Sequence, residues 1–338
     1  MKRWSSAKCQ KIIRYLQMFC ENRNPKNRTF AAKFIERDIL MKLKEKSYFV
    51  QLVVLALFTL GGMLVFSSLG TLLVMLLYHT PNILEAADPV TAIRITQTLT
   101  TIGTFLVPSL LFAYCYNRQW FDYNAANRQP RQSMVNMVLI LSVTLLPVVG
   151  VLAAFNESIM PQEGAVAEFM RDMEETANHI LGLVTSQRSS WDLIANILVF
   201  AVLAGICEEF FFQGTLQPLL TSWTRSPHIG ILLTALIFSA LHFQFYGFIP
   251  RFLLGLYLGY LLYWSKSLWL PILAHVLHNA LSILVDFTLQ GRGIDTDNMH
   301  FTDMKGSLPT AAACALISAM AIVYIWRIYR DGEHTNTL

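Results

Sequence analysis

Charged residues are scarce in this sequence: Asp, Glu, Lys and Arg make up 14% of its 338 residues, whereas hydrophobic residues make up 54%. Because soluble domains contain about 25% charged residues, this composition argues against an ordinary cytosolic enzyme. Cysteine is also scarce, with five residues and no CxxC pair, which excludes a small disulfide-rich protein. With 17 glycines and 12% aromatic residues, the sequence is neither collagen-like nor disordered.

The hydrophobic residues lie in runs that are long enough to cross a membrane. A hydrocarbon core about 30 Å thick needs about 20 apolar residues in a helix. We expect helices at about 48–78, 95–116, 133–155, 191–216, 229–246, 249–265, 269–289 and 308–328. The sequence therefore predicts an all-α, polytopic membrane protein with about eight transmembrane helices, and the lipid bilayer is its first expected partner.

The distribution of Lys and Arg predicts the orientation in the membrane. Residues 1–47 hold 13 of the 26 Lys and Arg residues and only four acids. If this arm is cytoplasmic, the segments on its side hold 20 Lys and Arg residues and the segments on the other side hold six. Cytoplasmic loops carry such an excess, so both termini are expected in the cytoplasm. The positive charge is local to the arm, so no nucleic-acid partner is expected.

These patterns divide the chain into six parts. We expect a basic cytoplasmic arm (1–47), accessory transmembrane helices 1–3 (48–155), an outer acidic loop (156–190), core helices 4–7 (191–290), a final transmembrane helix (308–328) and a cytoplasmic tail (329–338). Periodic apolar positions within the acidic loop predict a short surface helix there.

Ionisable side chains inside the apolar runs point to a functional site. A charged residue at mid-membrane costs at least about 2.5 kcal/mol, and such residues commonly mark a site. The fourth expected helix carries Glu208 and Glu209, the fifth carries His242, and the seventh carries His275 and Asn279. A purely structural hydrogen-bond network between helices is the alternative reading of these residues.

Their spacing indicates which side chains share a helical face. His275 and Asn279 are four residues apart and lie on one face, and Phe238 lies four residues before His242, where its ring can orient the imidazole. A buried carboxyl beside an imidazole can take a proton from water, while a second imidazole and a carboxamide can donate to a developing oxyanion. This combination is typical of a hydrolase that has no serine or cysteine nucleophile.

At these residues the sequence resembles the CAAX prenyl protease and bacteriocin-processing family of intramembrane endopeptidases, also called CPBP or Abi. The family pattern is EExxxR, then FxxxH, then HxxxN or HxxxD on successive core helices. The three motifs are carried by Glu208 and Glu209 with Gln213, by Phe238 and His242, and by His275 and Asn279. The resemblance covers about residues 190–290.

The resemblance implies a role for each matching residue. Glu208 would be the general base, His242 its partner, and His275 and Asn279 the oxyanion hole, with Glu209 as the second carboxylate of the catalytic set. It also implies a peptide or membrane-protein substrate and a multi-pass location in the plasma membrane, which is the inner membrane in a bacterium. No cofactor is expected. Zinc is the alternative, although the sequence lacks HExxH.

One position departs from the family pattern. Gln213 stands where the family usually has Arg, and Gln can hydrogen-bond Glu209 but supplies no charge. Glu209 would then be protonated or would pair with a basic residue from elsewhere, such as Arg251. The alternative is a non-catalytic membrane protein, either a proton-coupled transporter that uses the two glutamates or a membrane scaffold or bacteriocin-immunity protein built on a protease fold.

The depths of the two histidines raise a geometric question. At about 1.5 Å per residue, His275 would lie roughly 9 Å and His242 roughly 20 Å from the cytoplasmic ends of their helices. Tilted helices or later helix starts would bring the two side chains level. We expect a water-filled cavity that opens to the cytoplasm. The sequence gives no oligomeric state.

Overall fold

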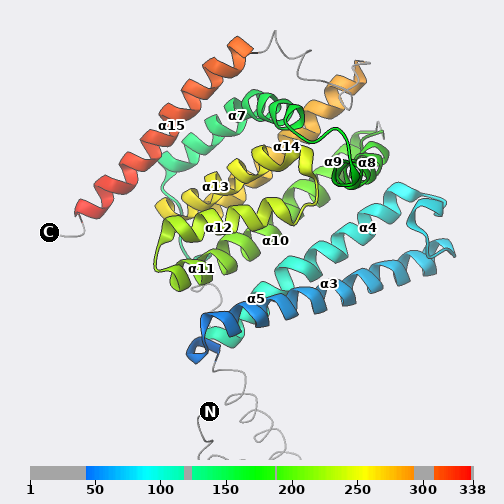
Figure 1. Cartoon of the computed structure of the whole chain (residues 1–338), viewed down its shortest axis with the longest axis horizontal. Helices are drawn as coiled ribbons and strands as arrows, with labels where there is room; N and C mark the ends of the chain where they lie inside the picture. Colours follow the sequence, from blue (N-terminus) through cyan, green and yellow to red (C-terminus); the bar gives the residue numbers. More distant parts are fainter. Residues whose placement is uncertain (1–42, 118–123, 187–188, 293–307, 336–338) are drawn as a thin grey trace, which may run out of the picture.

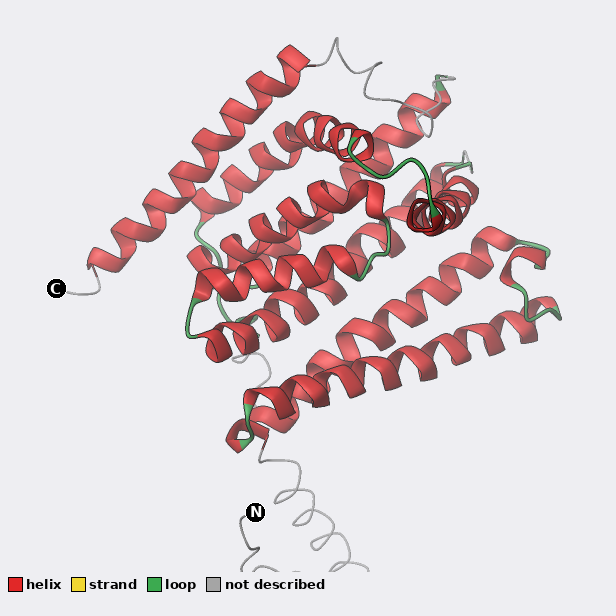
Figure 2. Ribbon diagram, viewed as in Figure 1, coloured by secondary structure: helices red, strands yellow, loops and turns green. Residues whose placement is uncertain are grey.

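The computed structural model describes residues 43–117, 124–186, 189–292 and 308–335. Every regular element in these ranges is a helix, so the expected all-α class is confirmed (Figure 2). The first 42 residues of the expected basic arm and residues 336–338 of the expected tail lie outside the described ranges. The surface helix expected in the acidic loop is present as α8 (Ala165–Thr185).

The order of the elements is shown in Figure 1. The chain runs through η1 (Leu43–Glu45), α3 (Tyr48–Tyr78), η2 (Ile83–Glu85), α4 (Pro89–Thr101), η3 (Ile102–Leu106), α5 (Val107–Asn117), α7 (Gln132–Ser158), α8, α9 (Ser190–Asn196), η4 (Ile197–Leu203), α10 (Ala204–Phe211), η5 (Phe212–Leu216), α11 (Gln217–Thr224), α12 (Pro227–Ala240), η6 (Phe245–Gly247), α13 (Phe248–Ser265), α14 (Trp269–Gly291) and α15 (Leu308–Thr335). The elements η3, η4 and η5 are π-helical turns inside longer helices, and η1, η2 and η6 are short 3₁₀ turns.

Among the described residues, seven helices are long and apolar enough to cross a membrane. The shorter apolar helix α12 completes the eight that the sequence predicts, so the polytopic membrane class is confirmed. The expected end of this fifth helix at residue 246 is wrong, because α12 stops at Ala240. Phe243 adopts a left-handed conformation with φ 53°, which interrupts the α-helical backbone. His242 consequently lies in a turn and not on the helix.

Two of the buried hydrophobic clusters join most of the core helices. The rings of Phe112, Phe211, Phe212 and Phe238 join α5, α10, η5 and α12 in one cluster. A second cluster includes Val138 and Leu141 of α7, Leu258 and Leu261 of α13, and Ile325 of α15. Figure 1 shows the result: α10 to α14 form a central group, with α7 and α15 on one side and α3 to α5 on the other.

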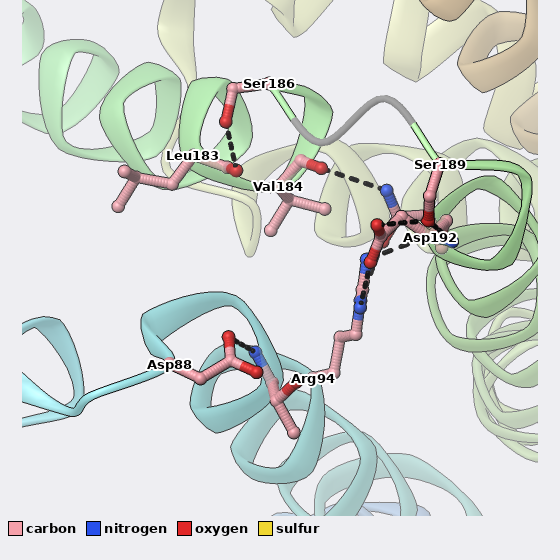
Figure 3. A network of polar contacts seen from close by, with 9 residues as sticks. Asp88, Arg94, Leu183, Val184, Ser186, Ser189 and Asp192 are labelled. Carbon is pink, nitrogen blue, oxygen red and sulfur yellow. Dashed lines mark hydrogen bonds and ion pairs between the residues drawn. The ribbon is translucent and has the colours of Figure 1, made fainter.

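A polar network joins α4 to the first turns of α9 and to the end of α8 (Figure 3). Arg94 donates from Nη1 to Asp192 Oδ1 at 2.8 Å and from Nε to Asn196 Oδ1 at 2.9 Å. Asn196 in turn donates to the carbonyl oxygen of Val184 at 3.0 Å. The guanidinium therefore connects the accessory helices to the helix that begins the core.

Replacing Arg94 with Ala should destabilise the fold. The change leaves the carboxylate of Asp192 and the amide oxygen of Asn196 without their donor, which costs about 1–3 kcal/mol of unfolding free energy. Thermal unfolding in detergent would show this as a lower midpoint temperature. Arg171→Ala on the exposed face of α8 is the matched control. Equal midpoints for the two variants would contradict a connecting role for Arg94.

Candidate active site

The two adjacent glutamates lie in a helix that contains π-helical turns on both sides of them. Residues Ser190 to Thr224 form one helix in which η4 precedes α10 and η5 follows it. Each π turn rotates the residues after it relative to a regular α-helix, and such turns are common at functional sites. Within α10, Glu209 is fully buried, whereas 13% of the Glu208 side chain is exposed. The two carboxyl groups therefore lie in different surroundings.

Glu209 pairs with His275 of α14. His275 donates from Nδ1 to Glu209 Oε1 at 2.8 Å, and both side chains are buried. The basic residue that meets Glu209 is thus His275 and not Arg251. Gln213 does not replace the family's Arg either, since neither of its buried amide atoms has a hydrogen-bond partner in the part of the chain that the structure describes.

A close approach of two helices makes this pair possible. A Cβ atom on Gly205 would lie 2.9 Å from Val276 Cγ2 and 3.2 Å from the Val276 backbone nitrogen. Only glycine allows α10 to pack so closely against α14. The short distance between the helices brings Glu209 within hydrogen-bond reach of His275, the residue next to Val276.

His242 is oriented by the residue four positions before it. Its Nδ1 donates to the carbonyl oxygen of Phe238 at 2.7 Å, which directs Nε2 away from α12. The Phe238 ring lies edge-on to the imidazole, with 4.8 Å between centroids, and it also lies 5.9 Å from the ring of His275. The expected packing of Phe238 against His242 is confirmed, and the same ring supports both imidazoles.

Glu208 lies between the two histidines. Its Oε2 is 4.0 Å from His242 Nε2 and 4.0 Å from His275 Nε2. These separations are too long for direct hydrogen bonds, but one water molecule can bridge groups at this distance. The difference in depth between His242 and His275 that the sequence suggested is absent, because both Nε2 atoms lie 4.0 Å from the same Glu208 oxygen.

Asn279 stands apart from these four side chains. It lies one turn after His275 on α14, and its Nδ2 donates to the carbonyl oxygen of Phe200 in η4 at 3.2 Å. This bond uses one of the two amide protons. The oxyanion role of Asn279 stays a prediction.

The side chains in this arrangement are spaced more widely than the ligands of a bound zinc ion. Two ligands at about 2.1 Å from a tetrahedral zinc lie about 3.4 Å from each other, which is shorter than the 4.0 Å from Glu208 to either histidine. Within the described ranges, no three His, Cys, Asp or Glu side chains gather in a way that would hold a metal.

Two residues near the site differ from what the sequence suggests: Glu174 is not expected there, and Arg251 is suggested as a partner of Glu209. Glu174 of α8 and Arg251 of α13 are electrostatic neighbours, and Arg251 is also a neighbour of Glu208. Partial burial raises the pKa of Glu174, while the Tyr246 backbone and Arg251 oppose this shift. The rings of Phe169 and Phe245, 6.0 Å apart, pack α8 against η6. In the sequence, only the acidic, amphipathic pattern of loop 156–190 indicated a helix that could pack against η6.

The helices and this cluster define a polytopic membrane protein with buried glutamate and histidine side chains at its centre. Residues 190–281 match the family model described as type II CAAX prenyl endopeptidase Rce1-like. The family indicated by the three sequence motifs is therefore confirmed for this segment, which contains all five expected site residues.

One relative matches a stretch of this chain about as long as the segment that matches the family model. The "Uncharacterized protein YpbD" of Bacillus subtilis (strain 168) is 32% identical over 91 residues, which are 26% of this chain and 43% of the relative. The chain thus covers less than half of the length of that relative. No solved structure matches the chain.

Proposed function

We propose that the protein is an intramembrane endopeptidase that hydrolyses a peptide bond with a water molecule activated by Glu208 and His242. The observation that carries this proposal is the position of Glu208 Oε2, 4.0 Å from the Nε2 atoms of both histidines. A water molecule between these atoms would donate its proton to the Glu208 carboxylate, and a hydrogen bond with the His242 imidazole would fix its orientation. The match of residues 190–281 to the Rce1-like model supports the same class of reaction.

The proposed reaction needs only groups of this chain, the peptide and water. Glu208 accepts a proton as the water oxygen attacks the peptide carbonyl, and the tetrahedral intermediate carries the negative charge on the former carbonyl oxygen. The Glu209 carboxylate stabilises a doubly protonated His275, whose Nε2–H then donates to this oxyanion together with Asn279. Glu208 returns the proton to the leaving amine as the C–N bond breaks.

The substrate that fits the site is a peptide or a membrane-protein segment that reaches the site within the bilayer. The site lies among helices that are long and apolar enough to cross a membrane, and the side chain of His242 is 29% exposed. A location in the plasma membrane is part of the same proposal.

Peptide cleavage tests the proposal directly. The protein purified in detergent should cleave members of a fluorescence-quenched peptide library, and His242→Ala should reduce the rate by about 10²- to 10⁴-fold, as expected for acid–base catalysis. An absence of cleavage by the wild-type protein across the library would contradict the proposal and favour the scaffold or transporter alternatives.

A strong zinc chelator should leave the rate of cleavage unchanged. The expected reaction uses the Glu208 carboxylate and water, so removing metal takes nothing from it. The measurement is the initial rate before and after incubation with chelator, with a known zinc peptidase as the positive control. Loss of cleavage that returns when zinc is added would show that metal is required.

The side of the membrane on which the site opens is a separate prediction. The turn that carries His242 leads into η6, which lies at the end of α7, since Asn156 donates to two backbone oxygens of η6, and α8 packs there through Phe169. The distribution of Lys and Arg predicts that this end lies outside the cytoplasm. The expected outer position of loop 156–190 therefore conflicts with a cavity that opens to the cytoplasm.

A cysteine introduced at Gln162 should decide between these expectations. We expect a membrane-impermeant maleimide to label Gln162→Cys in intact cells, because the charge distribution places this loop outside. The wild-type chain supplies the background from its five native cysteines. Labelling only after cell lysis would place α8 in the cytoplasm and would invert the orientation.

A further inference from the structure

We infer that Arg251 is a positioning residue of the proposed active site: it fixes the turn that carries His242 and brings a permanent positive charge within electrostatic range of Glu208. This inference rests on the proposed function. Arg251 lies in the first turn of α13, outside the three motifs of the family pattern.

The guanidinium of Arg251 hydrogen-bonds to the segment directly after His242. It donates from Nη1 to the backbone oxygen of Gln244 at 2.9 Å and from Nη2 to the side-chain oxygen of Gln244 at 2.9 Å. A planar fork with two donors fixes an orientation as well as a distance, which a lysine cannot do. Gln244 follows His242 by two residues, so this contact restrains the turn on which His242 lies.

A glycine makes room for the guanidinium. A Cβ atom on Gly247 would lie 2.7 Å from Arg251 Nη2 and 3.1 Å from its Cζ. The guanidinium therefore lies directly over the backbone of the turn. Any larger residue at position 247 would push it away from Gln244.

The other side of the turn is held by a neutral residue. Asn156, at the end of α7, donates from Nδ2 to the carbonyl oxygens of Phe245 and Tyr246, each at 2.8 Å, and its Oδ1 accepts from the backbone nitrogen of Ile249 at 2.9 Å. Asn156 is fully buried. One charged side chain, Arg251, and one uncharged side chain, Asn156, thus hold the turn. Substituting each in turn separates the effect of the charge from the effect of restraining the turn.

The charge of Arg251 acts on the proposed general base. Glu208 and Glu174 are the two carboxyl groups that interact electrostatically with this guanidinium, and His242 is a further neighbour. Oε2 of Glu208 is buried and has no hydrogen-bond partner in the described part of the chain. A cation in a site of low dielectric constant favours the ionised carboxylate that proton abstraction requires. The family's Arg is absent at Gln213, and Arg251 supplies a positive charge to the other glutamate from a different helix.

Three variants of the full chain test this inference by steady-state cleavage of a peptide that the wild-type protein cleaves. Arg251→Gln should lower kcat by about 10- to 100-fold, the size expected when a catalytic group is misplaced by about 1 Å, and KM should change little. Arg251→Lys should recover only part of kcat, because it keeps the charge but loses the two-donor contact with Gln244. Asn156→Ala should lower kcat less than Arg251→Gln, because it loosens the turn without removing charge.

Three results would overturn the inference. A wild-type kcat in Arg251→Gln would show that the residue has no positioning role. A raised KM with unchanged kcat would make Arg251 a substrate-binding residue instead. Equal losses of kcat in Arg251→Lys, Arg251→Gln and Asn156→Ala would show that Arg251 only restrains the turn and that its charge has no effect. Unfolding midpoints of all three variants identify any that lose rate by failing to fold.

A second measurement separates this inference from the proposed function. A membrane-permeant carbodiimide modifies protonated carboxyl groups, and mass spectrometry can follow the modification of Glu208. Arg251→Gln should be modified several-fold faster than wild type, and Arg251→Lys at the wild-type rate. If this order holds while no peptide is cleaved, the proposed function fails and the electrostatic role of Arg251 stands. Equal rates in all three proteins would overturn that role.

Discussion

Glu208→Gln is expected to lower kcat for peptide cleavage by about 10²- to 10⁴-fold, the usual contribution of a general base. The amide keeps the size of the side chain but cannot accept a proton from water. The partly exposed position of Glu208 and its lack of a direct hydrogen bond to His242 or His275 mean that the fold should be unaffected. Cleavage rates and unfolding midpoints in detergent measure the two effects.

The control for this substitution is Asp286→Asn, which makes the same change of chemistry on α14 away from the candidate site. It should leave kcat within a few-fold of wild type. Near-normal cleavage by Glu208→Gln would remove the central element of the proposed mechanism, because no other carboxyl group faces both Nε2 atoms in the described ranges.

Glu209→Ala is expected to reduce both activity and stability, unlike the change at its neighbour. Glu209 is fully buried and accepts the Nδ1–H of His275 at 2.8 Å. Breaking a buried charged pair by removing one partner costs about 3–5 kcal/mol of unfolding free energy. The loss of orientation at His275 should lower kcat as well. Circular dichroism during heating, together with cleavage rates, measures both.

Glu209→Gln is the informative comparison, since its amide oxygen can still accept from His275 Nδ1. It should lose less stability than Glu209→Ala and still lose activity, because it cannot stabilise a doubly protonated imidazole. If Glu209→Ala unfolds at the wild-type temperature, the pair does not hold α10 and α14 together.

The family resemblance and the helical spacing together predicted which side chains meet. Three motifs on three apolar segments placed Glu208, His242 and His275 in one site, and helical spacing correctly put the Phe238 ring against His242. The Phe238 prediction succeeds because the two residues are one helical turn apart, and the grouping of the three motifs succeeds because ionisable groups are costly to bury in lipid.

The same reasoning failed where the backbone departs from a regular α-helix. Gln213 lies in the π turn η5, so its position relative to Glu209 is not that of residues four apart in an α-helix, and the expected hydrogen bond is absent. The left-handed Phe243 ends α12 six residues early. The electrostatic interaction of Glu174 with Arg251 joins segments 77 residues apart, and no local pattern reveals it.

The short length of α12 has a consequence for the surrounding lipid. At about 1.5 Å per residue, its 14 residues extend about 21 Å, whereas the hydrocarbon core is about 30 Å thick. A helix this short creates a hydrophobic mismatch, which membranes relieve by local thinning. A thinned patch beside the turn that carries His242 would shorten the path that a peptide and water must travel from the surface. The cost of exposing their polar groups to lipid tails would fall accordingly.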